Sequence, residues 1–140
     1  MPQTIVTVAT RGQGFYEITR EAQAFVGRHA PQEGLLTLFV RHTSASLIVQ
    51  ENADASVRTD LSWFFHRLVP STDDPSMDWI VHRDEGPDDM PAHIKAALTA
   101  VSLGVPVTAG RLMLGTWQGI YLFEHRDLPH RREIVLHLGA

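Results

Sequence analysis

Short segments rich in apolar and β-branched residues, without the spacing of a helix, recur near both ends of the chain. Residues 4–10 (TIVTVAT) are typical of a strand, because β-branched side chains fit a pleated surface. Residues 35–41 and 45–50 carry apolar side chains on both faces, which predicts central strands in a sheet that is covered on both sides. Further strands are expected over residues 15–18, 105–108, 111–115, 119–125 and 132–138.

A helical pattern is clearest over residues 55–68. Apolar side chains recur there at i, i+4, i+7, i+8 and i+11, so they form one continuous stripe along the predicted helix. Asn52 or Asp54 can cap the start of this helix, and Pro70 marks its end.

Two shorter helices are expected over residues 20–28 and 91–102. Residues 70–89, which are rich in Asp, Pro and Ser, are predicted to form a long ordered loop, and loops of this length are usually functional or disordered. The strands come in runs, with the helices grouped between them rather than alternating one for one. This order predicts an α+β fold with a mainly antiparallel β-sandwich or sheet and about three helices.

The length and composition restrict the class of protein. A chain of 140 residues suits a single domain spanning residues 1–140, and it is too short for a (β/α)8 barrel. The chain has no Cys, which excludes disulfides, thiolate metal sites and a cysteine nucleophile. An apolar fraction of 44% and a charged fraction of 20% are typical of a globular protein.

The net charge of −4 is unevenly distributed. Residues 73–89 hold seven acidic residues and one Arg, or −6, so the remainder of the chain carries +2. No basic stripe indicates nucleic-acid binding, and the acidic stretch argues against it. The N-terminal residues do not resemble a signal peptide, and no apolar run is long enough for a membrane span. We therefore expect a soluble cytoplasmic protein.

The first group of chemically capable residues lies between two predicted strands, where Arg41 is followed by His42, Thr43, Ser44, Ala45 and Ser46. His42 can bind a metal, and Ser44 and Ser46 can bind an oxyanion together with backbone N–H groups. Alternatively, the hydroxyl groups satisfy local backbone groups at a polar corner, which is the favoured interpretation when the segment is considered alone.

The second group extends from the loop into the start of a predicted helix. His82 and His93 flank four carboxylates, which include Glu85 and Asp89. Imidazole and carboxylate groups are ligands of zinc and similar divalent ions. Asp88 and Asp89 can instead stabilise the helix start, whereas Glu85, which precedes a Gly, has no such structural role. The segment alone leaves a metal site and a structural role equally open.

The third group lies around residues 115–119 (GTWQG) and the strand that follows them. Thr116 and Gln118 offer neutral hydrogen bonds of the kind that orient a ligand. Strand alternation places Glu124 on an apolar face, where a carboxylate must be paired, protonated or bound. A structural ion pair with one of the Arg residues is the slightly favoured explanation for Glu124.

Together these motifs resemble the YjbQ-like family, which is often labelled secondary thiamine-phosphate synthase. The resemblance rests on residues 42–46 (HTSAS) with Asn52 and Asp54, on residues 82–95 (HRDEGPDDMPAHIK) and on residues 115–120 (GTWQGI), and it extends over nearly the whole chain. It implies a compact α+β sandwich that forms a homotrimer with a pocket near a subunit interface. It further implies a divalent metal held by His42, His82 and His93, with Glu85, Asp89 and Glu124 beside it.

Two functions are consistent with these residues. The first is a metal-assisted enzyme acting on a small phosphorylated metabolite, with weak thiamine-phosphate synthase activity as the resemblance implies. Its ligand-binding residues would be Ser44, Ser46, Asn52, Lys95, Arg111, Thr116 and Gln118. A His-rich site suits zinc better than Mg²⁺, and Glu85 or Glu124 would then serve as general base to a zinc-bound water. The alternative is a non-catalytic, trimeric metal-binding or metabolite-binding protein.

Overall fold

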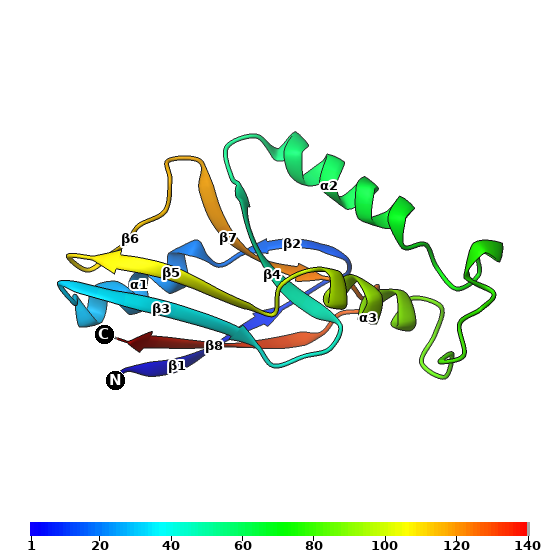
Figure 1. Ribbon diagram of the computed structural model, residues 1–140, viewed down its shortest axis with the longest axis horizontal. Coiled ribbons are helices and arrows are strands. Elements are labelled where there is room, and N and C mark those ends of the chain that lie inside the picture. Colours follow the sequence, from blue (N-terminus) through cyan, green and yellow to red (C-terminus); the bar gives the residue numbers. More distant parts are fainter. Residues whose placement is uncertain (140) are drawn as a thin grey trace.

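Eight strands form two antiparallel sheets in the computed structural model, which describes residues 1–139 (Figure 1). In spatial order, the first sheet contains β1 (Gln3–Ala9), β8 (Arg131–Gly139), β3 (Glu33–Val40), β5 (Ser102–Thr108) and β6 (Arg111–Leu112). The second sheet contains β2 (Gly14–Glu17), β7 (Gln118–Glu124) and β4 (Ala45–Glu51). The predicted α+β fold with mainly antiparallel strands is therefore confirmed.

The main apolar core is built from alternate residues of the central strands. Leu36 and Leu38 of β3 and Leu136 of β8 are fully buried, as the two-residue period of a strand requires of one sheet face. Ile120 and Leu122 of β7 belong to the same core, so the two sheets share it.

Three α-helices and one short 3₁₀ helix complete the chain: α1 (Thr19–His29), α2 (Ala55–Leu68), η1 (Pro75–Met77) and α3 (Asp89–Leu98). Helix α1 buries Ala22, Phe25 and Val26 in the main core. Helix α2 has the predicted bounds but contains no buried residue, and Figure 1 shows it leaning away from the strands. No helix within residues 1–139 is long and apolar enough to cross a membrane.

Three expectations about individual elements are wrong. The strand predicted over residues 111–115 ends at Leu112. Leu35 and Phe39 on the outer face of β3 are 45% and 47% exposed, so this central strand is covered on one side only. Helix α3 ends at Leu98, before the predicted residue 102. The backbone leaves the helix there because Ala100 forms a bridge to Leu47 of β4 and the carbonyl oxygen of Val101 accepts a hydrogen bond from Val40.

Candidate metal centre

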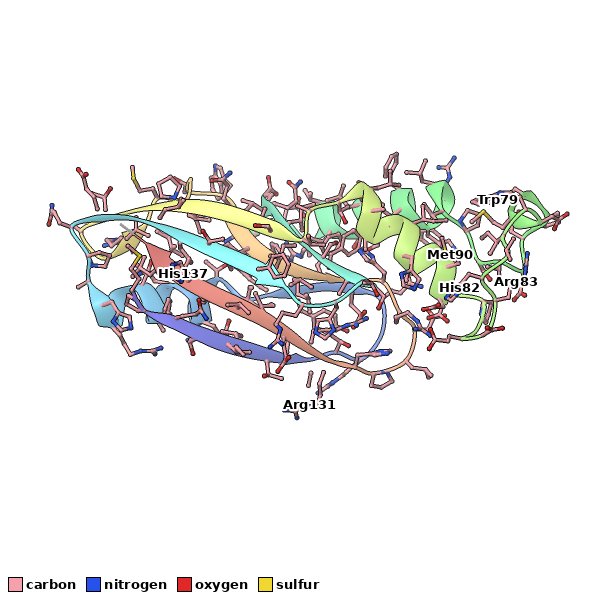
Figure 2. The ribbon with its side chains drawn as sticks, turned by 60° about the horizontal axis from the view of Figure 1, so that its bottom comes forward. Trp79, His82, Arg83, Met90, Arg131 and His137 are labelled. Atoms are coloured by element: carbon pink, nitrogen blue, oxygen red, sulfur yellow. The ribbon has the colours of Figure 1, made fainter. Side chains whose placement is uncertain are left out.

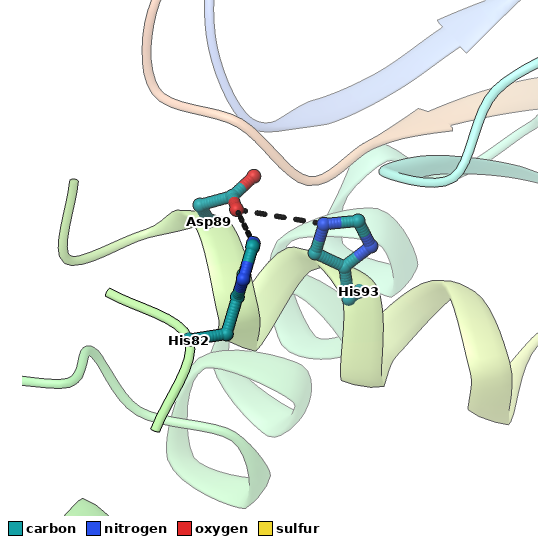
Figure 3. A group of neighbouring side chains, drawn as sticks. All are labelled: His82, Asp89 and His93. Carbon is teal, nitrogen blue, oxygen red and sulfur yellow. Dashed lines mark hydrogen bonds and ion pairs between the residues drawn. The ribbon is translucent and has the colours of Figure 1, made fainter. Parts of the chain in front are cut away.

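The first two turns of α3 place a carboxylate and an imidazole on one side of the helix. Asp89 and His93 are four residues apart, so their side chains are neighbours on the helix surface. His82 reaches the same point from the preceding loop (Figure 3). These three residues form a group of candidate metal ligands within residues 1–139, with one donor atom from each lying within 4.8 Å of the others.

The loop that carries His82 is held in place by a small core of its own. Val69, Met77 and Ile80 are buried together, with Met90 and Ile94 of α3 packed against them. The guanidinium group of Arg83 donates to the carbonyl oxygens of Ile80 at 2.9 Å and Met77 at 3.0 Å. Figure 2 shows His82, Arg83 and Met90 at one end of the molecule, far from His137. The predicted ordered loop is thus an extension that presents His82 to α3.

The distances within the group suit a tetrahedral metal ion. The Nε2 atoms of His82 and His93 lie 3.0 Å and 3.5 Å from Oδ2 of Asp89. Zinc bonds of about 2.0–2.2 Å to nitrogen and oxygen separate neighbouring tetrahedral ligand atoms by about 3.4 Å. The residues present therefore fit such an ion, and they leave a fourth ligand position for water or substrate.

Arg126 fixes the other oxygen of the same carboxylate. Its Nη1 donates to Oδ1 of Asp89 at 2.9 Å, and its Nε donates to Oδ2 of Asp88 at 2.8 Å. Partial burial alone would raise the pKa of Asp88, but the hydrogen bond and charge of Arg126 lower it overall. The same contacts raise the pKa of Arg126 despite its burial. Asp89 is therefore held in one orientation, with Oδ2 facing the two imidazoles.

A cleft of about 500 Å³ lies beside His93. His42 and Arg41 contribute to its wall, whereas Phe39 and Val101 are among its apolar residues. Nε2 of His42 accepts a hydrogen bond from the backbone N–H of Glu133 at 2.7 Å. Burial, followed by the charge of Arg132, lowers the pKa of His42.

His42 therefore shares the cleft with His93 but is not part of the group of close ligand atoms. The structure brings together His82 and His93 of the expected ligand set, and Asp89 takes the third place. Glu85 is exposed, and its backbone lies near this group, because its backbone carbonyl oxygen accepts a hydrogen bond from Arg126 at 2.9 Å.

Glu124 has the structural role that sequence analysis slightly favoured. Its fully buried carboxylate accepts hydrogen bonds from Nε of Arg132 at 2.8 Å and from the hydroxyl of Thr10 at 2.7 Å. Burial alone would raise the pKa of Glu124, but these hydrogen bonds lower it. Arg132 also donates to Oγ of Ser44 at 2.9 Å. A carboxylate paired in this way cannot reach a metal-bound water, so its predicted role as general base is withdrawn.

Ser46 and Lys95 are buried in different surroundings from the metal group. Oγ of Ser46 lies 2.9 Å from Nε2 of His125, and both residues are fully buried. Burial, with a smaller contribution from Lys95, lowers the pKa of His125 to about 3, so this imidazole is neutral. Burial likewise lowers the pKa of Lys95. Ser46 is thus inaccessible to an oxyanion, contrary to expectation.

The remaining predicted ligand-binding residues lie elsewhere. Strand register pairs Ala45 with Glu124 and Glu51 with Gln118, so Gln118 is at the opposite end of β7 from Arg126. The residues gathered at or near that far end are Asn52, Thr116 and Gln118, whereas Arg111 lies on β6. The structure therefore does not bring these four residues to the candidate metal centre.

Arg126, Arg132 and His125 were not among the site residues predicted from the sequence. His125 and Arg126 directly follow the apolar strand β7, and Arg132 pairs with Glu124 at the end of that strand. The abrupt change from apolar to polar residues after β7 was the available signal. It does not identify Ser46 and Asp89, the partners of His125 and Arg126, because both are distant in the sequence.

Comparison with known proteins gives a consistent result. The sequence profile described as "UPF0047 protein YjbQ-like" matches residues 3–140. A UPF0047 protein of Synechocystis is 50% identical over 99% of this chain and 91% of its own length. The UPF0047 protein YjbQ of Salmonella typhimurium is 45% identical over 95% of this chain and 94% of its own length.

Solved structures show the same fold. A conserved hypothetical protein from Thermus thermophilus has a TM-score of 0.83 and 38% identity, covering 96% of this chain and 98% of its own. An uncharacterised YjbQ/UPF0047 protein from Clostridium acetobutylicum has a TM-score of 0.81 and 30% identity, covering 99% of both chains.

Proposed function

The chain belongs to the UPF0047, YjbQ-like family, and we propose that it is a metal-assisted enzyme acting on a small phosphorylated metabolite. The observation that carries this proposal is the convergence of His82, Asp89 and His93 beside a cleft. Three protein ligands with a fourth position open are typical of catalytic zinc sites, whereas structural sites are saturated by four.

The donor atoms favour zinc over Mg²⁺. Two imidazole nitrogens and one carboxylate oxygen suit zinc or another transition metal, while Mg²⁺ prefers oxygen ligands and water. When bound, such an ion supplies an activated water and polarises a phosphoryl or carbonyl oxygen. Glu85 is the remaining candidate for general base, because Glu124 is paired and Asp89 serves as a ligand.

The cleft beside His93 supports a substrate that combines an anionic group with an apolar part. Arg41 and Thr43 line it together with apolar residues of β3 and α3. The Arg41 guanidinium is half-exposed and pairs with Glu133 at 3.4 Å, so it can turn towards a phosphate. In the thiamine-phosphate reaction implied by the family resemblance, a thiazole nitrogen displaces diphosphate from a pyrimidine methylene carbon. The cleft would then bind the departing diphosphate.

The alternative is a non-catalytic, trimeric metal-binding or metabolite-binding protein in the cytoplasm. The exposed Leu35 and Phe39 on β3, and the absence of buried residues in α2, support a homotrimer in which other copies cover these surfaces. Trimer formation is compatible with either function, so only a measurement of catalytic activity distinguishes the enzyme from the non-catalytic binding protein.

Zinc loading followed by dialysis and elemental analysis tests the metal site. We expect about one zinc ion per chain, at least a tenfold weaker zinc affinity in His93→Ala, and no change in His29→Ala, a matched exposed histidine on α1. If the loaded protein holds no zinc and His93→Ala leaves melting unchanged, the metal site must be abandoned.

Activity is tested separately by rescue of a thiamine-requiring strain and by diphosphate release in vitro. We expect both in the native protein and neither in the His82→Ala, His93→Ala double variant. Rescue that persists in the double variant would overturn the assigned site but leave the activity standing.

A further inference from the structure

Lys95, the single lysine of the chain, is buried without a counterion. Its side chain makes one hydrogen bond, from Nζ to Oε1 of Gln13 at 3.0 Å, and the residue is 3% exposed. Among residues 1–139, no carboxylate lies within ion-pair distance of this ammonium group. A lysine ammonium has three N–H donors, so two of them lack a protein acceptor in the described part of the chain.

The nearby acidic groups are engaged elsewhere. Oδ1 of Asp127 accepts a hydrogen bond from Nε2 of Gln13 at 2.7 Å. Oδ2 of Asp88 accepts hydrogen bonds from Nε of Arg126 and from the backbone N–H of Asp127. The neutral amide of Gln13 therefore lies between Lys95 and Asp127 and provides no charge of its own. Burying an ammonium group without a partner is unfavourable, so this arrangement indicates a missing anionic partner.

A cavity of about 40 Å³ adjoins Lys95. Its wall comprises Lys95, Gln13, Gly14, Ser62, Phe65 and Phe123, so it lies between α2, α3 and the second sheet. A neighbouring groove of about 220 Å³ shares Gln13 and Ser62 with the cavity and adds Trp63 and His66. The indole of Trp63 is largely exposed and offers a flat apolar wall.

We propose that this cavity binds the carboxylate of a small organic acid, with the body of the acid in the groove against Trp63. The carboxylate accepts hydrogen bonds from the two free N–H groups of Lys95, and the hydroxyl of Ser62 is available as a further donor. The cavity has room for a compact group, and a singly charged head is repelled less by Asp88 and Asp127 than a phosphate dianion is.

This site is separate from the candidate metal centre. Lys95 and His93 are two residues apart on α3, and side chains at that spacing do not face each other. The cavity around Lys95 and the cleft beside His93 have no lining residue in common. Carboxylate binding therefore goes beyond the proposed metal-assisted activity and requires no metal.

The single lysine gives a direct readout. Protein labelled with ¹³C-lysine has one side-chain Cε–Hε signal, and metal-free protein is titrated with benzoate, acetate, benzamide and inorganic phosphate. We expect the lysine signal to shift and saturate with benzoate. Acetate should bind more weakly because it lacks the ring, and benzamide should bind at least tenfold more weakly because it lacks the charge. Trp63→Ala should weaken benzoate binding severalfold and leave acetate binding unchanged.

Two variants separate binding from folding. Lys95→Met should abolish saturable benzoate binding, followed on the ligand signals, without lowering the melting temperature, because it removes an unpaired buried charge. His93→Ala should bind benzoate as the native protein does, so failure of the metal proposal would not affect this result. Equal binding of benzamide and benzoate, preferential binding of phosphate, or a lysine signal that does not saturate with benzoate would each overturn the carboxylate site.

Discussion

Arg126 and Asp89 are joined by a hydrogen bond of 2.9 Å that engages the one carboxylate oxygen not facing the imidazoles. The two residues come from different parts of the fold, since Arg126 follows β7 and Asp89 begins α3. Groups that orient a metal ligand in this way typically change metal affinity 10-fold to 100-fold when they are removed.

Replacing Arg126 should accordingly weaken the candidate metal site without removing a ligand. We expect Arg126→Met to lower zinc affinity by about 10-fold to 100-fold, because the carboxylate of Asp89 is then free to rotate away from the two imidazoles. Competition with a zinc-binding dye measures the effect, and Arg131→Met, at an exposed position on β8, is the matched control. An Arg126 variant that is folded and binds zinc as tightly as the control would contradict the proposed orientation.

The buried pair of Glu124 and Arg132 should determine stability and not catalysis. Arg132→Met leaves a carboxylate buried with no cation, and we expect it to lower the free energy of unfolding by about 3–5 kcal/mol. Combining Arg132→Met with Glu124→Leu should cost less than Arg132→Met alone, because neither charge then remains unpaired. Urea unfolding of the four proteins gives the comparison. A double variant less stable than either single variant would refute this account of the pair.

His125 should make stability depend on pH. Its pKa is about 3 in the folded protein and 6.5 as an ordinary imidazole, so the unfolded chain binds a proton first as the pH falls. Stability present above pH 6.5 is therefore lost between pH 6.5 and 3, by about 2 kcal/mol from pH 7 to 5. Urea unfolding at several pH values should show that the free energy of unfolding falls more steeply below pH 6.5 in the native protein than in His125→Gln. Parallel pH profiles for the two proteins would mean that the buried imidazole does not titrate as expected.

Much of the fold was predictable because local patterns coincide with the elements. Asp54 caps α2 by accepting a hydrogen bond from the backbone N–H of Ser56, and the helix ends shortly before Pro70, as expected. The positions of most strands could be predicted from runs of β-branched residues and from the alternation of buried and exposed side chains. The bounds of α3 did not follow, because the backbone of residues 100–101 is bound by strands distant in the sequence.

The candidate site was only partly predictable. His82 and His93 could be identified because two imidazoles flank a run of acids, and an acidic run invites a cation. Asp89 was ambiguous, since a carboxylate at a helix start has a sufficient structural explanation. His42 was placed in the ligand set by resemblance, but its Nε2 is occupied by the backbone of Glu133. Lys95 gave no sign of its isolation, because burial without a counterion is visible only in three dimensions.

The position of β8 between β1 and β3 has a consequence for how the chain folds. The strand formed latest in the sequence supplies the partner for the earliest one, pairing Gln3 with His137 and Ala9 with Arg131. During synthesis, β1 and one edge of β3 must therefore wait unpaired until residues near Gly139 have left the ribosome. Such long-range closure is slow compared with hairpin formation, and the waiting edges are where premature association between nascent chains would begin.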